Sequence, residues 1–156
     1  MTKYIMERKA EDNKYLHKDF HLTPDLGIAY VGENYGDLAV EKYLTQYAKS
    51  FYKPHIEEMK KDGLIAFKNY LEKIYKAEEC EDALEINLEN NILKVGIKYC
   101  PAVKYMLSVG HKPSKWYKQT VSLCYAVVAK ESGYNFKLIS YDEKNGSCEF
   151  IMGDNI

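Results

Sequence analysis

The spacing of the apolar residues changes near residue 83, and no other feature constrains the fold of this chain as strongly. Before residue 83, apolar side chains recur at three- and four-residue steps, which places them on one face of a helix. After it, short runs alternate apolar and polar residues, as strands with one buried face do. The change predicts helices followed by a sheet.

Helical segments are expected over residues 12–21, 24–34, 37–51 and 64–75. Thr23 fits an N-cap and Pro24 the first helical position, where proline is tolerated. Pro54 ends the third helix and starts a short segment that Gly63 closes. The apolar stripes of the third and fourth helices are expected at Val40, Tyr43, Leu44, Tyr47 and Phe51, and at Leu64, Phe67, Leu71, Ile74 and Tyr75.

Two hairpins joined by one helix are expected after residue 83. Asn90-Asn91 fits the first turn because Asn tolerates a positive φ, and Asn145-Gly146 fits the second. The helix between them is predicted from a Ser114 cap to Gly133. The predicted fold class is therefore α+β, with N-terminal helices packed on a four-stranded antiparallel sheet from a β-β-α-β-β C-terminal half. We expect a single domain over 1–156, with a helical part at 1–80 and a sheet-containing part at 83–152.

Length and charge exclude several classes of protein. The 156 residues are enough for one domain with a hydrophobic core, and the net charge of −1 gives no field that attracts nucleic acid or an anionic membrane. No apolar run approaches the ~20 residues of a spanning helix, and no signal sequence follows the first basic residues. We expect a cytoplasmic protein without nucleic-acid or membrane partners, whose four cysteines are free thiols.

Tyrosine is unusually frequent, with 15 residues against five Phe and one Trp. A buried tyrosine contributes an aromatic ring and keeps a hydroxyl for hydrogen bonding. A tyrosine-rich interior suits a pocket for a small polar-aromatic ligand. The alternative is the composition bias of an AT-rich genome, which the many Lys, Ile and Asn residues also indicate.

The stretch "DNKYLHKDFH" holds two of the four histidines. On a helix, Asn13, His17 and His21 fall on one edge, and two histidines four residues apart can chelate a divalent metal such as zinc, iron or manganese. Asp19 points away from His17, so a third ligand would come from elsewhere, with Cys100 and His111 as candidates.

Two other hypotheses account for the same histidines. They are either half-buried, hydrogen-bonded residues at the edge of the core, or an acid/base pair for a bound substrate, because histidine titrates near neutral pH. In the substrate hypothesis His17, His21 and Asp19 are catalytic, while Asn13 and Tyr15 contact the ligand.

Cys100 ends a predicted strand, and Pro101 begins a turn or helix. A thiol at a helix N-terminus is expected to be acidified by the helix dipole and thus to be more nucleophilic. The structural alternative is a small apolar plug at the end of the strand. Cys148 shares a strand face with Phe150 and Met152, and His111 lies in the loop "SVGHKPSKW", where binding groups often collect.

The segment from "YCPAVKYM" to "GSCEF" resembles the L-2-amino-thiazoline-4-carboxylic acid hydrolase-like family and, more distantly, is similar to the 4-vinyl reductase domain. The shared features are a Cys-Pro that ends a strand, a helix closed by Gly, and a last strand carrying Cys and Phe. The resemblance covers residues 84–152 and implies an α+β domain whose ligand cavity has Cys100 and Cys148 nearby. Ala102 and Val103 stand where the 4-vinyl reductase pattern has further cysteines, which argues against a cysteine-rich metal cluster.

Two hypotheses for function follow. The first is a hydrolase that cleaves a C–N bond of a small cyclic amidine or amide, with Cys100, His17, His21 and Asp19 as catalytic residues or, for the two histidines, metal ligands. The second is a non-catalytic small-ligand-binding domain of the sensor type. In both, His111 and Cys148 are candidate ligand contacts, the partner is a small molecule, and a homodimer is compatible.

Overall fold

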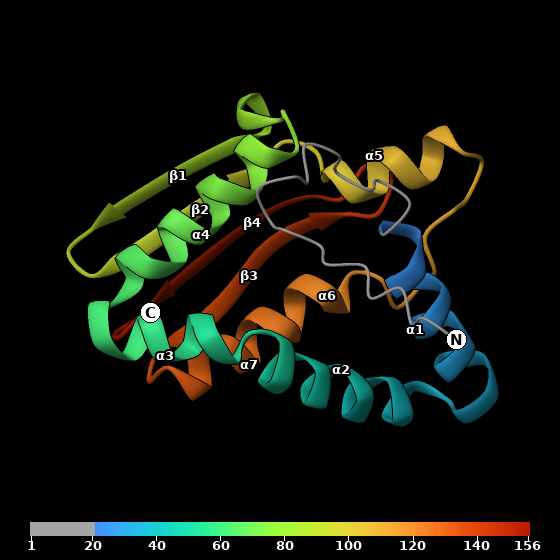
Figure 1. The fold of residues 1–156 in the computed structure, drawn as a ribbon, viewed down its shortest axis with the longest axis horizontal. Coiled ribbons are helices and arrows are strands. Elements are labelled where there is room, and N and C mark those ends of the chain that lie inside the picture. The colour runs from blue at the N-terminus through green and yellow to red at the C-terminus, as the bar shows by residue number, and fades with distance from the viewer. Residues whose placement is uncertain (1–20) are drawn as a thin grey trace, which may run out of the picture.

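Helices cover one face of a four-stranded antiparallel sheet in the computed structural model, which describes residues 21–156 (Figure 1). The strands are β1 (Leu84–Glu89), β2 (Ile92–Ile97), β3 (Asn135–Asp142) and β4 (Ser147–Gly153), and their order in the sheet is β1-β2-β4-β3. The two hairpins thus join through β2 and β4. The α+β prediction is confirmed.

Both predicted hairpin turns are present. Asn90 and Asn91 have φ values of 51° and 57°, in the left-handed region that a two-residue turn of this type requires. Gly146 has a φ of 69° at the end of the second turn. In the pairing of β2 with β4, Ile97 lies opposite Cys148. The last residue of β2 is therefore next to the start of β4, and the residues after Ile97 leave the sheet at that point.

The described helices match the segments expected over 24–34, 37–51 and 64–75, with small shifts of their ends. They are α1 (Leu22–Tyr35), α2 (Asp37–Phe51), α3 (Lys53–Asp62) and α4 (Leu64–Ala77). The helix expected over 12–21 falls on residues that lie, except for His21, outside the described part of the chain. A short 3-10 turn, Glu81–Ala83, precedes β1, and α5 (Pro101–Ser108) follows β2. The predicted stripe of α2 is wrong at Tyr43 and Phe51, which are 41% and 55% exposed, while Ala48 is buried.

The single helix predicted over 114–133 is wrong in its first half. Residues 115–118 form turns, and the rest is divided into α6 (Gln119–Ser122) and α7 (Cys124–Glu131). The Ser114 amide and hydroxyl both donate to the carboxylate of Asp25 in α1, at 3.0 and 2.6 Å. These contacts with a distant helix replace the straight helical start that the local sequence favours.

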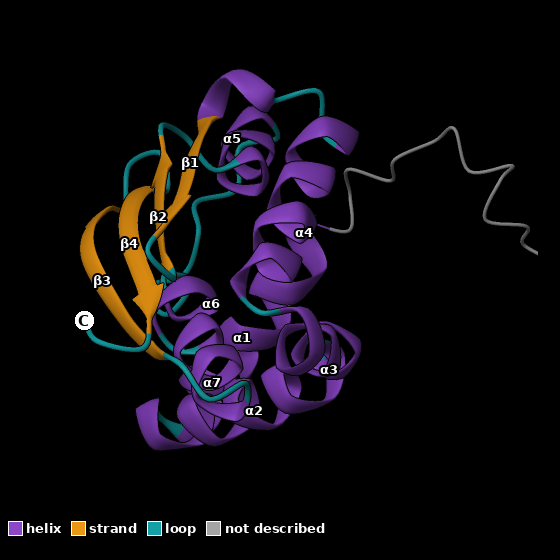
Figure 2. Cartoon of the chain, turned by 90° about the vertical axis from the view of Figure 1, so that its left-hand side faces the viewer, coloured by secondary structure: helices purple, strands orange, loops and turns teal. Residues whose placement is uncertain are grey.

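Two helices share the covered face of the sheet. α7 contacts β3, whereas α4 contacts β1 and β2, and α2 packs against α7 and α1. Figure 2 shows the strands on one side of the molecule and the helices on the other. We expected one helix to cover the sheet with the N-terminal helices alongside, but α4 is itself part of the covering layer.

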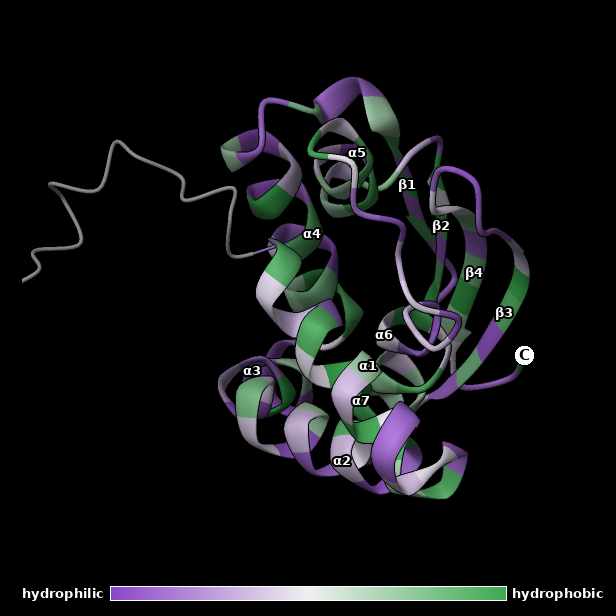
Figure 3. Ribbon diagram, turned by 90° about the vertical axis from the view of Figure 1, so that its right-hand side faces the viewer, coloured by the Kyte–Doolittle hydropathy of each residue, from purple (hydrophilic) through white to green (hydrophobic). Residues whose placement is uncertain are grey.

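The core lies between the sheet and these helices. Hydrophobic residues recur along α4, α7 and the strands, with hydrophilic residues between them (Figure 3). The sheet contributes Leu93, Val95, Phe150 and Met152, of which each is almost fully buried, and α4 contributes Phe67 and Leu71. Among residues 21–156, the helices are too short or too polar to cross a bilayer.

Candidate ligand-binding cavity

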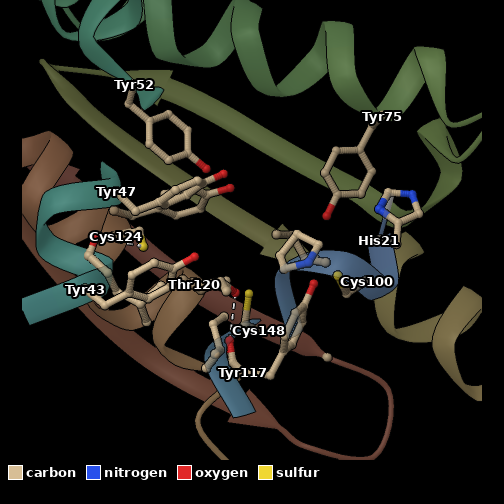
Figure 4. A pocket seen from close by; sticks show the side chains of 17 residues that line it. His21, Tyr43, Tyr47, Tyr52, Tyr75, Cys100, Tyr117, Thr120, Cys124 and Cys148 are labelled. Carbon is tan, nitrogen blue, oxygen red and sulfur yellow. Dashed lines mark hydrogen bonds between the residues drawn. The ribbon is translucent and has the colours of Figure 1, made fainter. Parts of the chain in front are cut away.

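A cavity of about 260 Å³ lies between the helices and the ends of β2 and β4 (Figure 4). Its wall comes from α1, α2, α4, β2, α6, α7 and β4, together with residues at the junctions between elements. The lining residues are His21, Pro24, Ile28, Tyr43, Leu44, Tyr47, Tyr52, Tyr75, Ile97, Cys100, Tyr117, Thr120, Val121, Cys124, Tyr125, Gly146 and Cys148.

Tyrosine rings form much of this wall. In Figure 4 the hydroxyls of Tyr43, Tyr47, Tyr52, Tyr75 and Tyr117 point into one shared space, although their backbones belong to different elements. This group of side chains, together with Tyr125, is called the tyrosine cluster below. The tyrosine-rich pocket expected from composition is therefore present in the fold.

Burial keeps these phenols in their neutral form. Removal from water raises the pKa of Tyr47 to about 12 and raises the pKa values of Tyr75, Tyr117 and Tyr125 above their usual range. Neighbouring thiols and phenols add to these shifts. At neutral pH the cavity thus presents O–H groups, each able to donate or accept one hydrogen bond.

Ring contacts hold the cluster in place. Tyr52 meets Tyr125 edge to face, with ring centroids 6.1 Å apart, and Phe67 meets Tyr125 at 5.2 Å. Tyr125 in turn packs on Phe150 of β4 at 5.5 Å. The contacts run from α2 through α7 to the sheet, so the positions of the hydroxyls depend on the packed core.

Cys100 forms part of the wall at the N-terminus of α5, and the predicted start of a helix at Pro101 is confirmed. The prediction that Cys100 ends a strand is wrong, because β2 ends at Ile97. Its amide donates to the carbonyl of Asn145 at 2.9 Å, which ties it to the β3–β4 turn. Gly146 leaves room for it, because a Cβ on Gly146 would lie 2.6 Å from Cys100 Cβ. The turn signal Asn145-Gly146 therefore also positions Cys100.

The expected acidification of Cys100 is opposed by its burial. Desolvation raises the pKa of the thiol, and this outweighs the lowering by the amides of Val103 and Ala102 and by a hydrogen bond from Tyr117. The helix N-terminus acts in the predicted direction but is the weaker influence. Cys148 also lines the cavity, and burial raises its pKa to about 12, so both groups are thiols at neutral pH.

His21 lies in the cavity wall directly before α1. Its Nε2 is 2.8 Å from Oε1 of the half-buried Glu78, close enough for an ion pair but not aligned as a hydrogen bond. Its ring also faces Tyr105 of α5, with centroids 6.1 Å apart. His21 and Cys100 thus belong to one cavity, as the hydrolase hypothesis requires.

His111 does not line the cavity, contrary to its assignment as a ligand contact. Its Nε2 and Oδ2 of Asp25 are 2.8 Å apart, and the carboxylate of Asp25 is fully buried. The same carboxylate accepts from Ser114, so this cluster fastens the loop before α6 onto α1. His111 therefore has a structural partner away from the tyrosine cluster.

Several predicted site residues cannot be compared with this geometry. Asn13, Tyr15, His17 and Asp19 lie outside the described residues. In the described part of the chain, His, Cys, Asp and Glu side chains do not gather in any group of three or more that could hold a metal ion. Neither Cys100 nor His111 therefore completes a three-ligand group with His21 there.

The sequence did not identify the tyrosine cluster residue by residue. Tyr43, Tyr47 and Tyr75 occur in predicted apolar stripes, where they were interpreted as core, and Tyr117, Thr120 and Tyr125 fall in the helix predicted over 114–133. The total of 15 tyrosines was the one signal for the cavity. No family model, no curated protein and no solved structure matches the chain.

Proposed function

We propose that this chain binds a small, mostly apolar molecule in the cavity lined by the tyrosine cluster. The observation that carries the proposal is the partly open cavity of about 260 Å³ bordered by aromatic rings, hydroxyls and thiols. Small-ligand sites are concave and mainly apolar, with a few polar groups that orient the ligand. The described wall has this composition.

The volume sets the size of the ligand. A cavity of roughly 150 Å³ accommodates benzene, with six non-hydrogen atoms. The same ratio gives about ten non-hydrogen atoms for the cavity here, the size of a two-ring aromatic compound. Tyrosine rings at edge-to-face angles offer such a compound both ring faces and ring edges to contact.

A matched pair of variants tests this proposal. Val121 lines the cavity, whereas Val109 is 52% exposed at the end of α5. Val121→Phe should fill part of the cavity, and Val109→Phe should add the same atoms at the surface. Binding of two-ring aromatic compounds is followed on the whole chain by chemical-shift changes in two-dimensional NMR spectra and by the thermal midpoint.

Ligand at a hundred times its Kd should stabilise the unmodified chain and Val109→Phe by about 2.7 kcal/mol. Val121→Phe should show no such gain at the same concentration. If no two-ring compound shifts the resonances of the tyrosine cluster, or if both variants respond alike, the proposal is wrong.

A second candidate is hydrolysis of a cyclic amidine or amide, which the resemblance to the L-2-amino-thiazoline-4-carboxylic acid hydrolase-like family suggests. One observation favours it: the Cys100 thiol lies in the wall beside the amides of Ala102 and Val103, in the same cavity as His21. In this reaction Cys100 Sγ would bond to the ring carbon as the C–N bond breaks. Its proton would pass through His21 to the departing nitrogen, and water would then release the product and restore the thiol.

The raised pKa of Cys100 makes the resting thiol a weak nucleophile, which ranks this candidate second. Its test is turnover of 2-amino-thiazoline-4-carboxylate by Cys100→Ser beside Cys80→Ser, a buried thiol outside the cavity. Hydrolysis should be lost in Cys100→Ser and kept in Cys80→Ser. Activity that survives in Cys100→Ser, or is absent from the unmodified chain, removes this candidate.

A further inference from the structure

Tyr75 combines deep burial with a hydroxyl that has no bonding partner in the described chain. The residue is 6% exposed, and its hydroxyl points from α4 into the cavity (Figure 4). Among residues 21–156, no hydrogen bond contributes to the shift of its pKa, which comes from burial and from nearby Cys100, Cys148, Cys80 and Glu78. A hydroxyl that faces a cavity and has no partner in the surrounding protein is free to bond to water or to a ligand.

The polar neighbours of Tyr75 are either engaged or weak. The imidazole of His21 lies 2.8 Å from Glu78 Oε1 without forming a hydrogen bond to it, and Tyr117 interacts with the Cys100 thiol. The thiols of Cys100 and Cys148 are protonated and are weak donors and acceptors. At this end of the cavity Tyr75 therefore offers a neutral hydroxyl that can donate to a ligand.

The charge of the cavity wall further restricts the chemical class of the ligand. Among the described lining residues, the only basic side chain is that of His21, which faces Glu78. Burial of an ion without a counter-charge is costly, so this part of the wall favours an uncharged molecule. A neutral phenol matches an uncharged acceptor such as a ring nitrogen, a carbonyl or an ether oxygen.

We infer that the ligand is a neutral planar aromatic compound carrying a hydrogen-bond acceptor, and that the Tyr75 hydroxyl donates to this acceptor. The inference rests on the proposed ligand-binding function and specifies the chemical class of its ligand. The rings of the tyrosine cluster contact the apolar body, while Tyr75 fixes its orientation by bonding to the heteroatom.

Two probes of equal shape test this inference. Naphthalene and quinoline each have two fused six-membered rings, but only quinoline has a ring nitrogen that accepts a hydrogen bond. At pH 8 both are neutral. The ratio of their Kd values is measured by NMR titration on the unmodified chain and on Tyr75→Phe, which removes the hydroxyl and keeps the ring. Tyr30→Phe, with its ring 61% exposed, is the control.

Tyr75→Phe should raise the Kd of quinoline about three- to tenfold, which is the net effect of one hydrogen bond. The Kd of naphthalene should stay unchanged or fall slightly. Tyr30→Phe should alter neither. The comparison of ratios cancels the difference in hydration between the two probes.

The possible results separate the two proposals. If both probes bind, if Val121→Phe prevents binding of both, and if Tyr75→Phe leaves the ratio unchanged, ligand binding stands and the role of Tyr75 is wrong. If neither probe binds the unmodified chain at concentrations up to its solubility, the proposed ligand class is wrong. The proposed function then depends on the wider set of two-ring compounds tested against Val121→Phe and Val109→Phe.

Discussion

Two glycines in the interior of α1 offer a sharp test of the packing between α1 and the loop before α6. A Cβ on Gly32 would lie 2.5 Å from atoms of the Trp116 ring, whereas the nearest atom to a Cβ on Gly27 is the Tyr43 hydroxyl at 3.6 Å. The first distance is a clash and the second is ordinary contact. The same substitution, to alanine, should therefore have opposite effects at the two positions.

The magnitudes follow from three terms. Alanine in place of glycine inside a helix stabilises by roughly 1 kcal/mol at either position. At Gly32 the indole must move, and forcing extra atoms into a packed core costs about 1–3 kcal/mol. The movement also disturbs the bond from Trp116 Nε1 to Asp37 Oδ1, now 2.7 Å, worth about 1 kcal/mol. We expect Gly27→Ala to gain about 1 kcal/mol and Gly32→Ala to lose about 1–3 kcal/mol.

Urea unfolding, followed by far-UV circular dichroism and by the fluorescence of the single tryptophan, measures both values. A third variant identifies the cause. In a Trp116→Phe background the smaller ring should leave room, so Gly32→Ala should cost less there than in the unmodified chain. Equal stability of the two alanine variants, or no coupling to Trp116, would refute the packing described for α1.

Asp25→Ala should destabilise the chain by about 3 kcal/mol, because it leaves the part-buried donors of Ser114 and His111 unpaired. Asp62→Ala, at an exposed carboxylate, should cost under about 1 kcal/mol. Urea midpoints of the two variants that do not differ would contradict this. Stability should also fall as pH rises above 9. Burial raises the pKa of Cys148 to about 12 from the ordinary 9.0. Between these two pKa values the thiol is deprotonated in the unfolded chain but not in the folded one. The free energy of unfolding should therefore fall by up to about 1.4 kcal/mol per pH unit over this range. Cys148→Ser should reduce the slope of unfolding free energy against pH over this range, and an unchanged slope would show that the thiol does not contribute.

Local signals were sufficient to predict most of the fold. Asn90-Asn91 and Asn145-Gly146 specify backbone with positive φ, which few residues adopt, so each locates its hairpin without knowledge of the rest of the chain. The helix boundaries at Gly36 and Gly63 are of the same kind, with φ values of 84° and 80°. Such information is contained in a few neighbouring residues.

The break between residues 114 and 124 could not be predicted in this way. Asp25 and Gly32 lie more than 80 residues from Ser114 and Trp116, and their contacts decide how the chain enters α6. Apolar periodicity over 114–133 favours a continuous helix and contains no trace of these partners. The carboxylate of Asp25 is an ordinary acidic residue in the sequence and becomes a fixed anchor in the fold.

The sequence indicates that a tyrosine-lined cavity could exist, but it does not identify the tyrosines that line it. The number of tyrosines indicated that some must be buried, but Tyr30 and Tyr35 are well exposed while Tyr52 and Tyr75 line the cavity. Tyr30, Tyr35 and Tyr75 lie in helices, and Tyr52 lies in the turn between α2 and α3. Which hydroxyl faces the cavity depends on how α1, α2 and α4 pack, and this is a property of the tertiary structure.

The connection between α4 and β1 has a consequence for dividing the chain into fragments. The wall of the cavity is split at this point, with Tyr47, Tyr52 and Tyr75 before it and Cys100, Tyr117 and Tyr125 after it. Glu79 there adopts a φ of 54° in a short turn that leads to Glu81–Ala83. A chain cut at this turn would yield two pieces that each carry an open half of the wall. Only association of the two fragments would restore the complete cavity. A compound that binds in this cavity would therefore stabilise the complex of the two fragments.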